Sequence, residues 1–143
     1  MIELYIKSSG YPKKDILNNI SVGFEKGKLT SIIGQNGCGK STLLKTLLGM
    51  IPCIDGEVYA DGMNVLSSKR KEVARRIAYL SQGKSTPDMT VEQMVLHGRF
   101  PHLSYPRRYS ERDRQIALDA MKTVGISEYA QYSMPSLSGG MRQ

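Results

Sequence analysis

The N-terminal part of the chain alternates apolar and polar residues with the period of a β-strand. Residues 2–9 place an apolar side chain at alternate positions, which predicts a strand with one buried face. The turn residues 10–12 separate this segment from a second strand-like segment, 16–24, so we expect two antiparallel strands. The segment 29–33 is short and rich in isoleucine, and it predicts a third, buried strand.

The apolar period changes to that of a helix after residue 39. Leu43, Leu44, Leu47 and Leu48 recur at helical spacing, and Gly49 follows them as a stop signal. Beyond this helix, the pattern predicts a short strand over 56–62, a short polar helix over 67–76 and a strand over 77–80.

The last third of the chain has the pattern of a helical segment. Thr90 with Gln93, and Ser110 with Asp113, have the spacing of capping boxes, so each predicts a helix N-terminus. One apolar face is expected on each helix, and the residues 100–109 between them are expected to form a loop. The expected faces consist of Val91, Met94, Val95 and Gly98 in the first helix, and of Ala117, Ala120, Met121 and Val124 in the second.

Composition narrows the classes of protein that the chain can belong to. Its 143 residues include 20 Lys and Arg against 13 Asp and Glu, a formal charge of +7, which favours an anionic partner. The basic residues are dispersed without interleaved aromatic residues, which argues against direct nucleic-acid binding. Two cysteines are too few for a disulfide scaffold. The sequence contains no apolar run of about 18 residues, so no membrane span is predicted.

The segment 34–41 matches the phosphate-loop pattern G-x-x-x-x-G-K-[ST], and it lies between the strand expected over 29–33 and the helix that follows. Its glycines allow backbone N–H groups to turn toward phosphate oxygens, and the helix N-terminus favours an anion. Lysine and serine at the end of the pattern serve the β- and γ-phosphates and Mg²⁺. The predicted nucleotide-binding residues are Gly34, Gln35, Asn36, Gly37, Cys38, Gly39, Lys40, Ser41 and Thr42.

A second motif, at residues 137–143, gives the chain a family resemblance. Its sequence, Leu-Ser-Gly-Gly-Met-Arg-Gln, is similar to the signature of ATP-binding cassette (ABC) transporter ATPases, except that methionine occupies position 141 where glutamine is usual. The resemblance implies that Leu137, Ser138, Gly139 and Gly140 act on ATP held by a second subunit. It also implies an α/β P-loop NTPase fold, with an antiparallel layer and an incomplete parallel core within residues 1–82 and a helical subdomain over 83–143.

Two single residues also resemble family positions. Gln82 is similar to the glutamine that contacts Mg²⁺ and the attacking water, and Tyr11 is similar to the aromatic residue that stacks on adenine. The resemblance therefore implies ATP and Mg²⁺ as cofactors, with Lys40 and Gln82 as the catalytic residues present and Ser41 and Gln82 as the Mg²⁺ contacts.

The segment 96–102 and the aromatic loop after it are similar to cassettes that import iron–siderophores, haem or cobalamin. The implied partners are a second ABC subunit in a homodimer, a membrane permease and a substrate-binding protein, with the chain peripheral at the cytoplasmic face of the membrane. His97 and His102 have no spacing typical of a tight metal site, so we expect them to be ordinary loop and surface residues.

Two alternatives stay open from the sequence. The family's metal-binding aspartate, water-polarising glutamate and switch histidine follow the signature, and none of these positions lies within residues 1–143. We therefore expect the chain alone to hydrolyse ATP barely, which leaves a non-catalytic nucleotide-binding fragment as one alternative. A non-transport cassette acting on RNA or ribosomes is the other, because the positive charge allows it.

Overall fold

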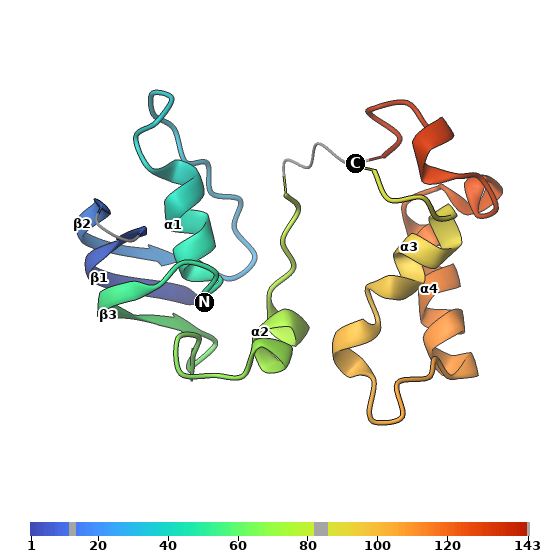
Figure 1. The fold of residues 1–143 in the computed structure, drawn as a ribbon, viewed down its shortest axis with the longest axis horizontal. Helices are drawn as coiled ribbons and strands as arrows, with labels where there is room; N and C mark the ends of the chain where they lie inside the picture. The colour runs from blue at the N-terminus through green and yellow to red at the C-terminus, as the bar shows by residue number, and fades with distance from the viewer. Residues whose placement is uncertain (12–13, 82–85, 143) are drawn as a thin grey trace. The chain divides into compact units, whose positions relative to one another are not determined.

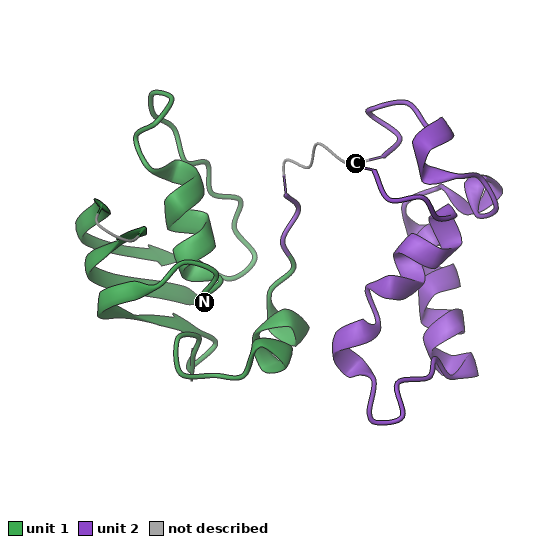
Figure 2. Ribbon diagram, viewed as in Figure 1, with its two compact units in different colours: residues 1–78 green, residues 79–143 purple. Residues whose placement is uncertain are grey.

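The computed structural model describes residues 1–11, 14–81 and 86–142, and it divides into two compact units. Unit 1 is Met1–Ala78 and unit 2 is Tyr79–Gln143 (Figures 1 and 2). Unit 1 has a sheet with helices beside it, whereas unit 2 is helical. Each unit has its own hydrophobic core, so each is described by itself.

The sheet of unit 1 has four antiparallel strands in the order β2-β1-β3-β4. β1 pairs with β2 on one side and with β3 on the other, so the expected antiparallel pair at the N-terminus is confirmed. The third strand, β3, begins earlier than the predicted residue 56. The strands are β1 (Ile2–Tyr11), β2 (Lys14–Phe24), β3 (Cys53–Ala60) and β4 (Met63–Asn64).

Helix α1 (Lys40–Leu47) packs on one face of this sheet (Figure 1). Leu4 and Ile6 of β1 and Val58 of β3 are buried in one core with Leu47 and the helix's C-cap, Leu48. This burial confirms the alternation predicted for the first strand, because Tyr5 and Lys7, which alternate with Leu4 and Ile6 along β1, are exposed.

The buried face of α1 includes two threonines. Leu44, one of the four leucines at helical spacing, is 39% exposed, whereas Thr42 and Thr46 are buried. Threonine is accepted on this face because the Thr46 hydroxyl has a hydrogen-bond partner there, the hydroxyl of Ser9 on β1. Periodicity of apolar residues alone cannot show such a partner.

The predictions of a buried strand over 29–33 and of a strand over 77–80 are wrong for this structure. Neither segment is a strand, and Leu29, Ile33 and Leu80 are 99%, 92% and 73% exposed. A strand requires hydrogen bonds to a neighbouring strand. Within the described residues, the sheet consists of β1 to β4 alone and every pairing is antiparallel, so the expected parallel core is not formed there.

The helix expected over 67–76 is shorter in the structure, where α2 spans Arg70–Arg76. The Asn64 side chain accepts hydrogen bonds from the N–H groups of Leu66 and Ser67 at 3.0 and 3.2 Å. This local turn competes with helix formation, so α2 begins later.

Unit 2 contains helices α3 (Val91–His97) and α4 (Glu111–Thr123), and both predicted capping boxes are confirmed. The Thr90 hydroxyl accepts from the Gln93 N–H at 3.2 Å, and the Gln93 side chain accepts from the Thr90 N–H at 2.9 Å. Three short 3-10 helices complete the unit, and the first replaces part of the loop expected over 100–109. They are η1 (Phe100–His102), η2 (Ser127–Tyr129) and η3 (Met134–Ser136).

The core faces of α3 and α4 are narrower than expected. On α3, Leu96 is buried but the expected Met94 is 39% exposed. On α4, Val124 is 67% exposed and Ala120 is also exposed, so both predictions are wrong. Each helix buries a single row of residues. The buried residues of α4 are therefore spaced by four: Asp113, Ala117 and Met121.

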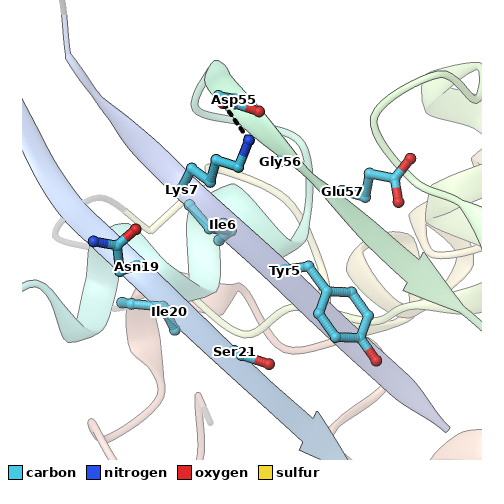
Figure 3. A pocket seen from close by; sticks show the side chains of 9 residues that line it. All are labelled: Tyr5, Ile6, Lys7, Asn19, Ile20, Ser21, Asp55, Gly56 and Glu57. Atoms are coloured by element: carbon cyan, nitrogen blue, oxygen red, sulfur yellow. Dashed lines mark ion pairs between the residues drawn. The ribbon is translucent and has the colours of Figure 1, made fainter.

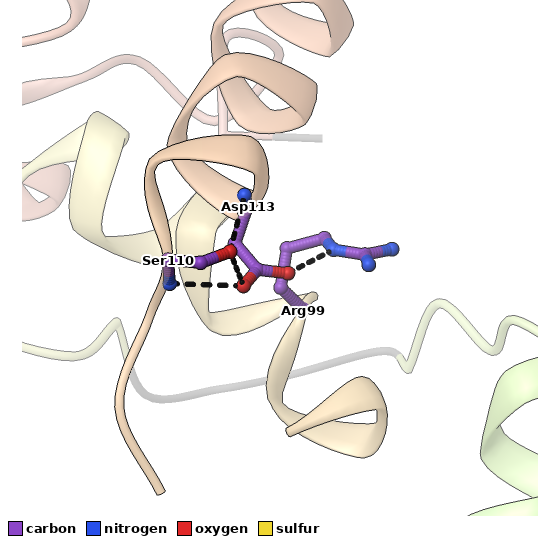
Figure 4. Close-up of polar contacts among 3 residues, drawn as sticks. All are labelled: Arg99, Ser110 and Asp113. Carbon is purple, nitrogen blue, oxygen red and sulfur yellow. Dashed lines mark hydrogen bonds and ion pairs between the residues drawn. The ribbon is translucent and has the colours of Figure 1, made fainter. Parts of the chain in front are cut away.

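A partly buried ion pair joins Arg99, just after α3, to Asp113 in the first turn of α4 (Figure 4). The Arg99 Nε atom donates to the Asp113 carboxylate at 3.0 Å, and the Ser110 hydroxyl and N–H donate to the other carboxylate oxygen at 2.6 and 3.0 Å. The hydrogen bonds from Ser110, and to a smaller extent the bond from Arg99, lower the pKa of Asp113 from 3.8 to about 2. The ionised carboxylate is therefore the form that stabilises this junction.

We expect Asp113→Asn to remove part of the acid sensitivity of unit 2. Because the pKa of Asp113 is lowered in the folded state, its stabilising contribution is complete above about pH 4 and is lost as the pH falls toward 2. Urea unfolding followed by circular dichroism, at about pH 5 and at about pH 2.5, should show a smaller loss of stability in the variant.

The matched control for this experiment is Asp119→Asn, on the exposed side of α4. Asp119 pairs with Lys122 at 3.8 Å, and both side chains are more than half exposed. The control should lose stability on acidification as the unmodified chain does. An equal response of the two variants would contradict the role given to Asp113.

Candidate functional site

The candidate site lies where the glycine-rich segment 34–39 meets the N-terminus of α1. Gly39 is the N-cap of the helix, and it offers no side chain to the first N–H groups. The first turn contains no acidic residue, and the first helical hydrogen bond runs from the Leu43 N–H to the Gly39 carbonyl at 2.8 Å. The positive end of the helix is therefore left without a counter-charge on α1, as an anion-binding site requires.

The loop glycines are required for two different reasons. Gly37 and Gly39 have φ values of 83° and 101°, in the left-handed region that side chains rarely adopt. At Gly34 the constraint is space, because a Cβ there would lie 2.8 Å from the Sγ atom of Cys38. The backbone conformation of the loop thus requires the glycine spacing of the motif.

The Lys40 side chain returns over the loop that precedes it. Its Nζ atom donates to the carbonyls of Gly34 and Gln35, both at 2.7 Å, and lies 3.8 Å from the Sγ atom of Cys38. An ammonium group has three hydrogens, so these partners use all of its donors. The cation is therefore held at the loop.

The remaining loop residues differ in exposure. Gln35, Asn36, Cys38 and Ser41 are exposed, whereas Thr42 is buried on the face of α1 that packs on the sheet. The Ser41 hydroxyl is thus accessible on the first turn of the helix and suits an oxygen ligand of Mg²⁺.

Strand β2 contacts the loop through residues that the sequence analysis did not single out. A Cβ added at Gly39 would lie 3.2 Å from Leu17 and 3.3 Å from Ile16. These two residues are adjacent and both apolar, so they interrupt the alternation of apolar and polar residues expected in a strand. That interruption was the signal in the sequence that could have identified them. Tyr11 is the last residue of β1 rather than a loop residue as expected, and it is 44% exposed.

Gln82, the predicted contact of Mg²⁺ and water, lies outside the described residues. The segment before it, 77–81, contains no helix or strand. The site assembled by the described part of unit 1 therefore consists of the loop, Lys40 and Ser41.

The second predicted site, residues 137–140, is anchored in the core of unit 2. Leu137 is buried together with Val91, Met121 and Met134. The Ser138 hydroxyl accepts from the Met141 N–H at 3.4 Å, and the Ser138 carbonyl accepts from the Arg142 N–H at 3.1 Å. Ser138 therefore stands at the start of a single helical turn.

The glycines of this second site are not required by the fold of unit 2. Apart from its chain neighbours, no atom of the described residues would lie within 4 Å of a Cβ on Gly139 or Gly140, and neither residue has a left-handed φ. This differs from the phosphate loop, where Gly34, Gly37 and Gly39 are constrained by the chain itself. The open space beside Gly139 and Gly140 suits the close approach of another molecule.

A hollow of about 660 Å³ lies on the sheet away from this loop (Figure 3). The Lys7 ammonium and the Asp55 carboxylate form an exposed ion pair across it at 3.2 Å. No residue of the phosphate loop lines it, so we do not assign it to the candidate site. Its lining residues are Tyr5, Ile6, Lys7, Asn19, Ile20, Ser21, Asp55, Gly56 and Glu57.

The predicted surface histidine His97 stacks on Phe100, with ring centroids 5.5 Å apart. Within residues 1–11, 14–81 and 86–142, no three His, Cys, Asp or Glu side chains gather in a way that suits a metal ion. In the same ranges, no helix has the length and apolar character needed to cross a bilayer.

The sequence from residue 17 to 143 matches a family model described as ABC transporter. The chain belongs to the ABC transporter family. Among curated ABC proteins, it is 43% identical over 135 residues to the ferric enterobactin transport ATP-binding protein FepC of Escherichia coli. It is 39% identical over 135 residues to the iron(3+)-hydroxamate import ATP-binding protein FhuC of Bacillus subtilis. Both alignments cover 94% of this chain and 50% of the relative, so the chain spans about half the length of these relatives.

Solved ABC structures resemble the chain along almost its whole length. A metal-chelate type ABC transporter in an inward-facing conformation matches 99% of this chain and 51% of its own, with a TM-score of 0.74 and 28% identity. A nucleotide-free ATP-binding cassette from an ABC transporter matches 99% of this chain and 60% of its own, with a TM-score of 0.82 and 25% identity. The P-loop NTPase cassette fold predicted from the two motifs is therefore confirmed.

Alkylation of Cys38 should block nucleotide binding to this ABC cassette. The thiol is exposed, and its Sγ atom lies 3.8 Å from the Lys40 Nζ atom, so an added group would occupy the loop. We expect N-ethylmaleimide to abolish binding of a fluorescent ATP analogue, and we expect prior addition of ATP to slow the modification.

Cys53 provides the internal control, because it is the other cysteine of the chain and lies on β3. A Cys38→Ala variant should bind the analogue equally before and after treatment. Normal binding by the chain alkylated at Cys38 would show that this thiol is only a small spacer in the loop.

Proposed function

We propose that this chain is the nucleotide-binding part of an ATP-binding subunit that powers an ABC importer for iron–siderophore, haem or cobalamin. The observation that carries the proposal is the glycine loop at the uncapped N-terminus of α1, with the Lys40 cation held over it. The relatives FepC and FhuC carry names of ferric enterobactin and iron(3+)-hydroxamate import, which supports the iron–siderophore class of cargo.

In this proposal, the loop binds the triphosphate of ATP with N–H groups from residues 34–42. Lys40 exchanges its loop carbonyls for β- and γ-phosphate oxygens. Ser41 and Gln82 provide contacts to Mg²⁺, and the exposed ring of Tyr11 at the end of β1 stacks on adenine. Mg²⁺ would supply charge neutralisation between the β- and γ-phosphates.

The signature residues Leu137 to Gly140 serve the partner in this proposal. Ser138 and the N–H groups of Gly139 and Gly140 contact the γ-phosphate of ATP bound to a second copy, in a homodimer. The open space at both glycines supports this role, because among the described residues only their chain neighbours lie within 4 Å of the positions their Cβ atoms would take.

Hydrolysis requires groups beyond those in residues 1–143. We assign Lys40 and Gln82 to charge stabilisation and water contact, and the metal-binding aspartate and water-polarising glutamate to a segment outside this sequence. The subunit acts at the cytoplasmic face of the membrane, where closure of the dimer drives a permease that receives cargo from a substrate-binding protein. Residues 1–82 and 83–143 are then the two parts of one incomplete nucleotide-binding domain.

Lys40→Ala should weaken ATP binding by about tenfold or more, because it removes charged hydrogen bonds to phosphate. Titration calorimetry of the 143-residue chain with Mg-ATP measures this change. The control is Lys28→Ala, which removes an exposed lysine 4.0 Å from Glu25 and should leave the dissociation constant unchanged. Equal affinity of the Lys40 variant and the unmodified chain would overturn the assignment of the loop.

A chimera tests the importer assignment. Replacing the matched half of the E. coli FepC protein with this chain should restore ferric enterobactin uptake in cells that lack FepC. Within the chimera, Gly139→Asp should reduce uptake by about tenfold or more, since a carboxylate would face phosphate oxygens. Its melting temperature should not change, because the space around Gly139 is open.

Uptake by the Gly139→Asp chimera at the normal rate would remove the role of the signature in trans. A folded chimera that binds ATP but restores no uptake would favour the non-catalytic binding fragment. Binding to RNA that falls steeply with salt would instead support the nucleic-acid alternative.

A further inference from the structure

A buried pair of hydroxyl groups connects β1 to the helix that follows the phosphate loop. Ser9 of β1 and Thr46 of α1 are both 0% exposed, and their hydroxyl oxygens lie 2.8 Å apart. The Ser9 hydroxyl also donates to the Pro52 carbonyl at 3.0 Å. Three segments of unit 1 therefore meet at one serine.

The donors and acceptors of this network can be assigned. The Pro52 carbonyl only accepts, and a serine hydroxyl has one hydrogen, so Ser9 donates to Pro52. Thr46 must then donate to Ser9. Both hydroxyl hydrogens of the pair are used. Removing Ser9 leaves the Thr46 hydroxyl and the Pro52 carbonyl without this partner, and removing Thr46 leaves the Ser9 oxygen without its donor.

Ser9 stands at an irregular point of the sheet. The pairing of β1 with β2 shifts between Ser9 and Gly10, and the pairing of β1 with β3 shifts between Ser8 and Ser9. At Gly10 the strands approach so closely that a Cβ would lie 2.2 Å from the Lys14 carbonyl oxygen. The path of β1 after this point therefore depends on more than regular strand pairing.

Tyr11 follows two residues after Ser9 and ends β1. At the other end of the connection, Thr46 lies on the same helix as Lys40 and Ser41, and it shares the buried face with Thr42. A fixed bond between Ser9 and Thr46 thus couples the position of the Tyr11 ring to that of the loop at the start of α1.

We propose that Ser9 and Thr46 form a positioning pair, which holds the Tyr11 end of β1 in register with α1 so that base and triphosphate of one nucleotide are bound together. This inference rests on the proposed function, since it assumes that the loop binds the phosphates and Tyr11 the base. The pair does not contact the nucleotide itself. It therefore affects the part of the ATP affinity that comes from the base and leaves the part that comes from the phosphates unchanged.

The experiment compares two ligands of the 143-residue chain, Mg-ATP and Mg-tripolyphosphate, by titration calorimetry. Ser9→Ala and Thr46→Val should each weaken ATP binding about three- to tenfold, the range of one stacking contact. Binding of tripolyphosphate should stay within about twofold of the original value. Thr46→Ser keeps the hydroxyl and should retain the original ratio of the two affinities.

Ser8→Ala is the matched control. Ser8 is the neighbouring residue on β1, and its buried hydroxyl has no hydrogen-bond partner among the described residues. The same substitution there removes a hydroxyl without breaking the network. The ratio of ATP to tripolyphosphate affinity should be unchanged, and thermal melting of each variant shows that it is folded.

A double-mutant cycle with Tyr11→Ala decides whether the pair acts through Tyr11. If it does, Ser9→Ala has no further effect on ATP binding once the ring is absent. Additive losses, or equal losses for ATP and tripolyphosphate, would overturn the positioning role. Failure of the unmodified chain to bind either ligand would overturn the proposed function itself. Normal ATP binding by Tyr11→Ala would remove only the base site and this inference.

Discussion

The packing of α1 on the antiparallel sheet is the contact on which the candidate site depends. Leu47 and Leu48 bury apolar surface against β1 and β3, and the hydroxyl pair of Ser9 and Thr46 adds a directional bond within the same contact. Apolar packing alone tolerates small shifts of a helix, whereas a buried hydrogen bond specifies one arrangement. The N–H groups at the opposite end of α1 keep their position because the apolar packing holds the helix on the sheet, while the hydroxyl pair sets the register of the helix against β1.

The two predicted sites are held in place by different features of the structure. The phosphate loop follows a path that its own glycines make possible, with left-handed φ values at Gly37 and Gly39. The signature turn has no such backbone requirement, and it is fixed because Leu137 is buried in the core of unit 2. Damage to that core would therefore displace Ser138 without any change in the motif, whereas the loop depends on its own glycines and on the packing of α1.

Local signals in the sequence predicted the local features of the structure. Both capping boxes, the antiparallel pair at the N-terminus and the loop before α1 depend on residues close together in the chain, and each was found where expected. The strands predicted over 29–33 and 77–80 were wrong, because strand formation depends on a distant partner that propensity does not reveal. The buried threonine face of α1 was missed for a related reason, since its partner Ser9 lies 37 residues away.

In the proposed function, the bonds from Lys40 to the carbonyls of Gly34 and Gln35 give nucleotide binding the character of an exchange. The ammonium is already desolvated in part and already bonded, so phosphate oxygens replace existing acceptors rather than fill an empty coordination shell. The net gain is a difference between two well-bonded states, which is smaller than the strength of either one. Affinity is then tuned as much by how strongly the loop carbonyls compete for the cation as by the lysine itself. The backbone of Gly34 and Gln35 thus acts as an internal competitor of the nucleotide.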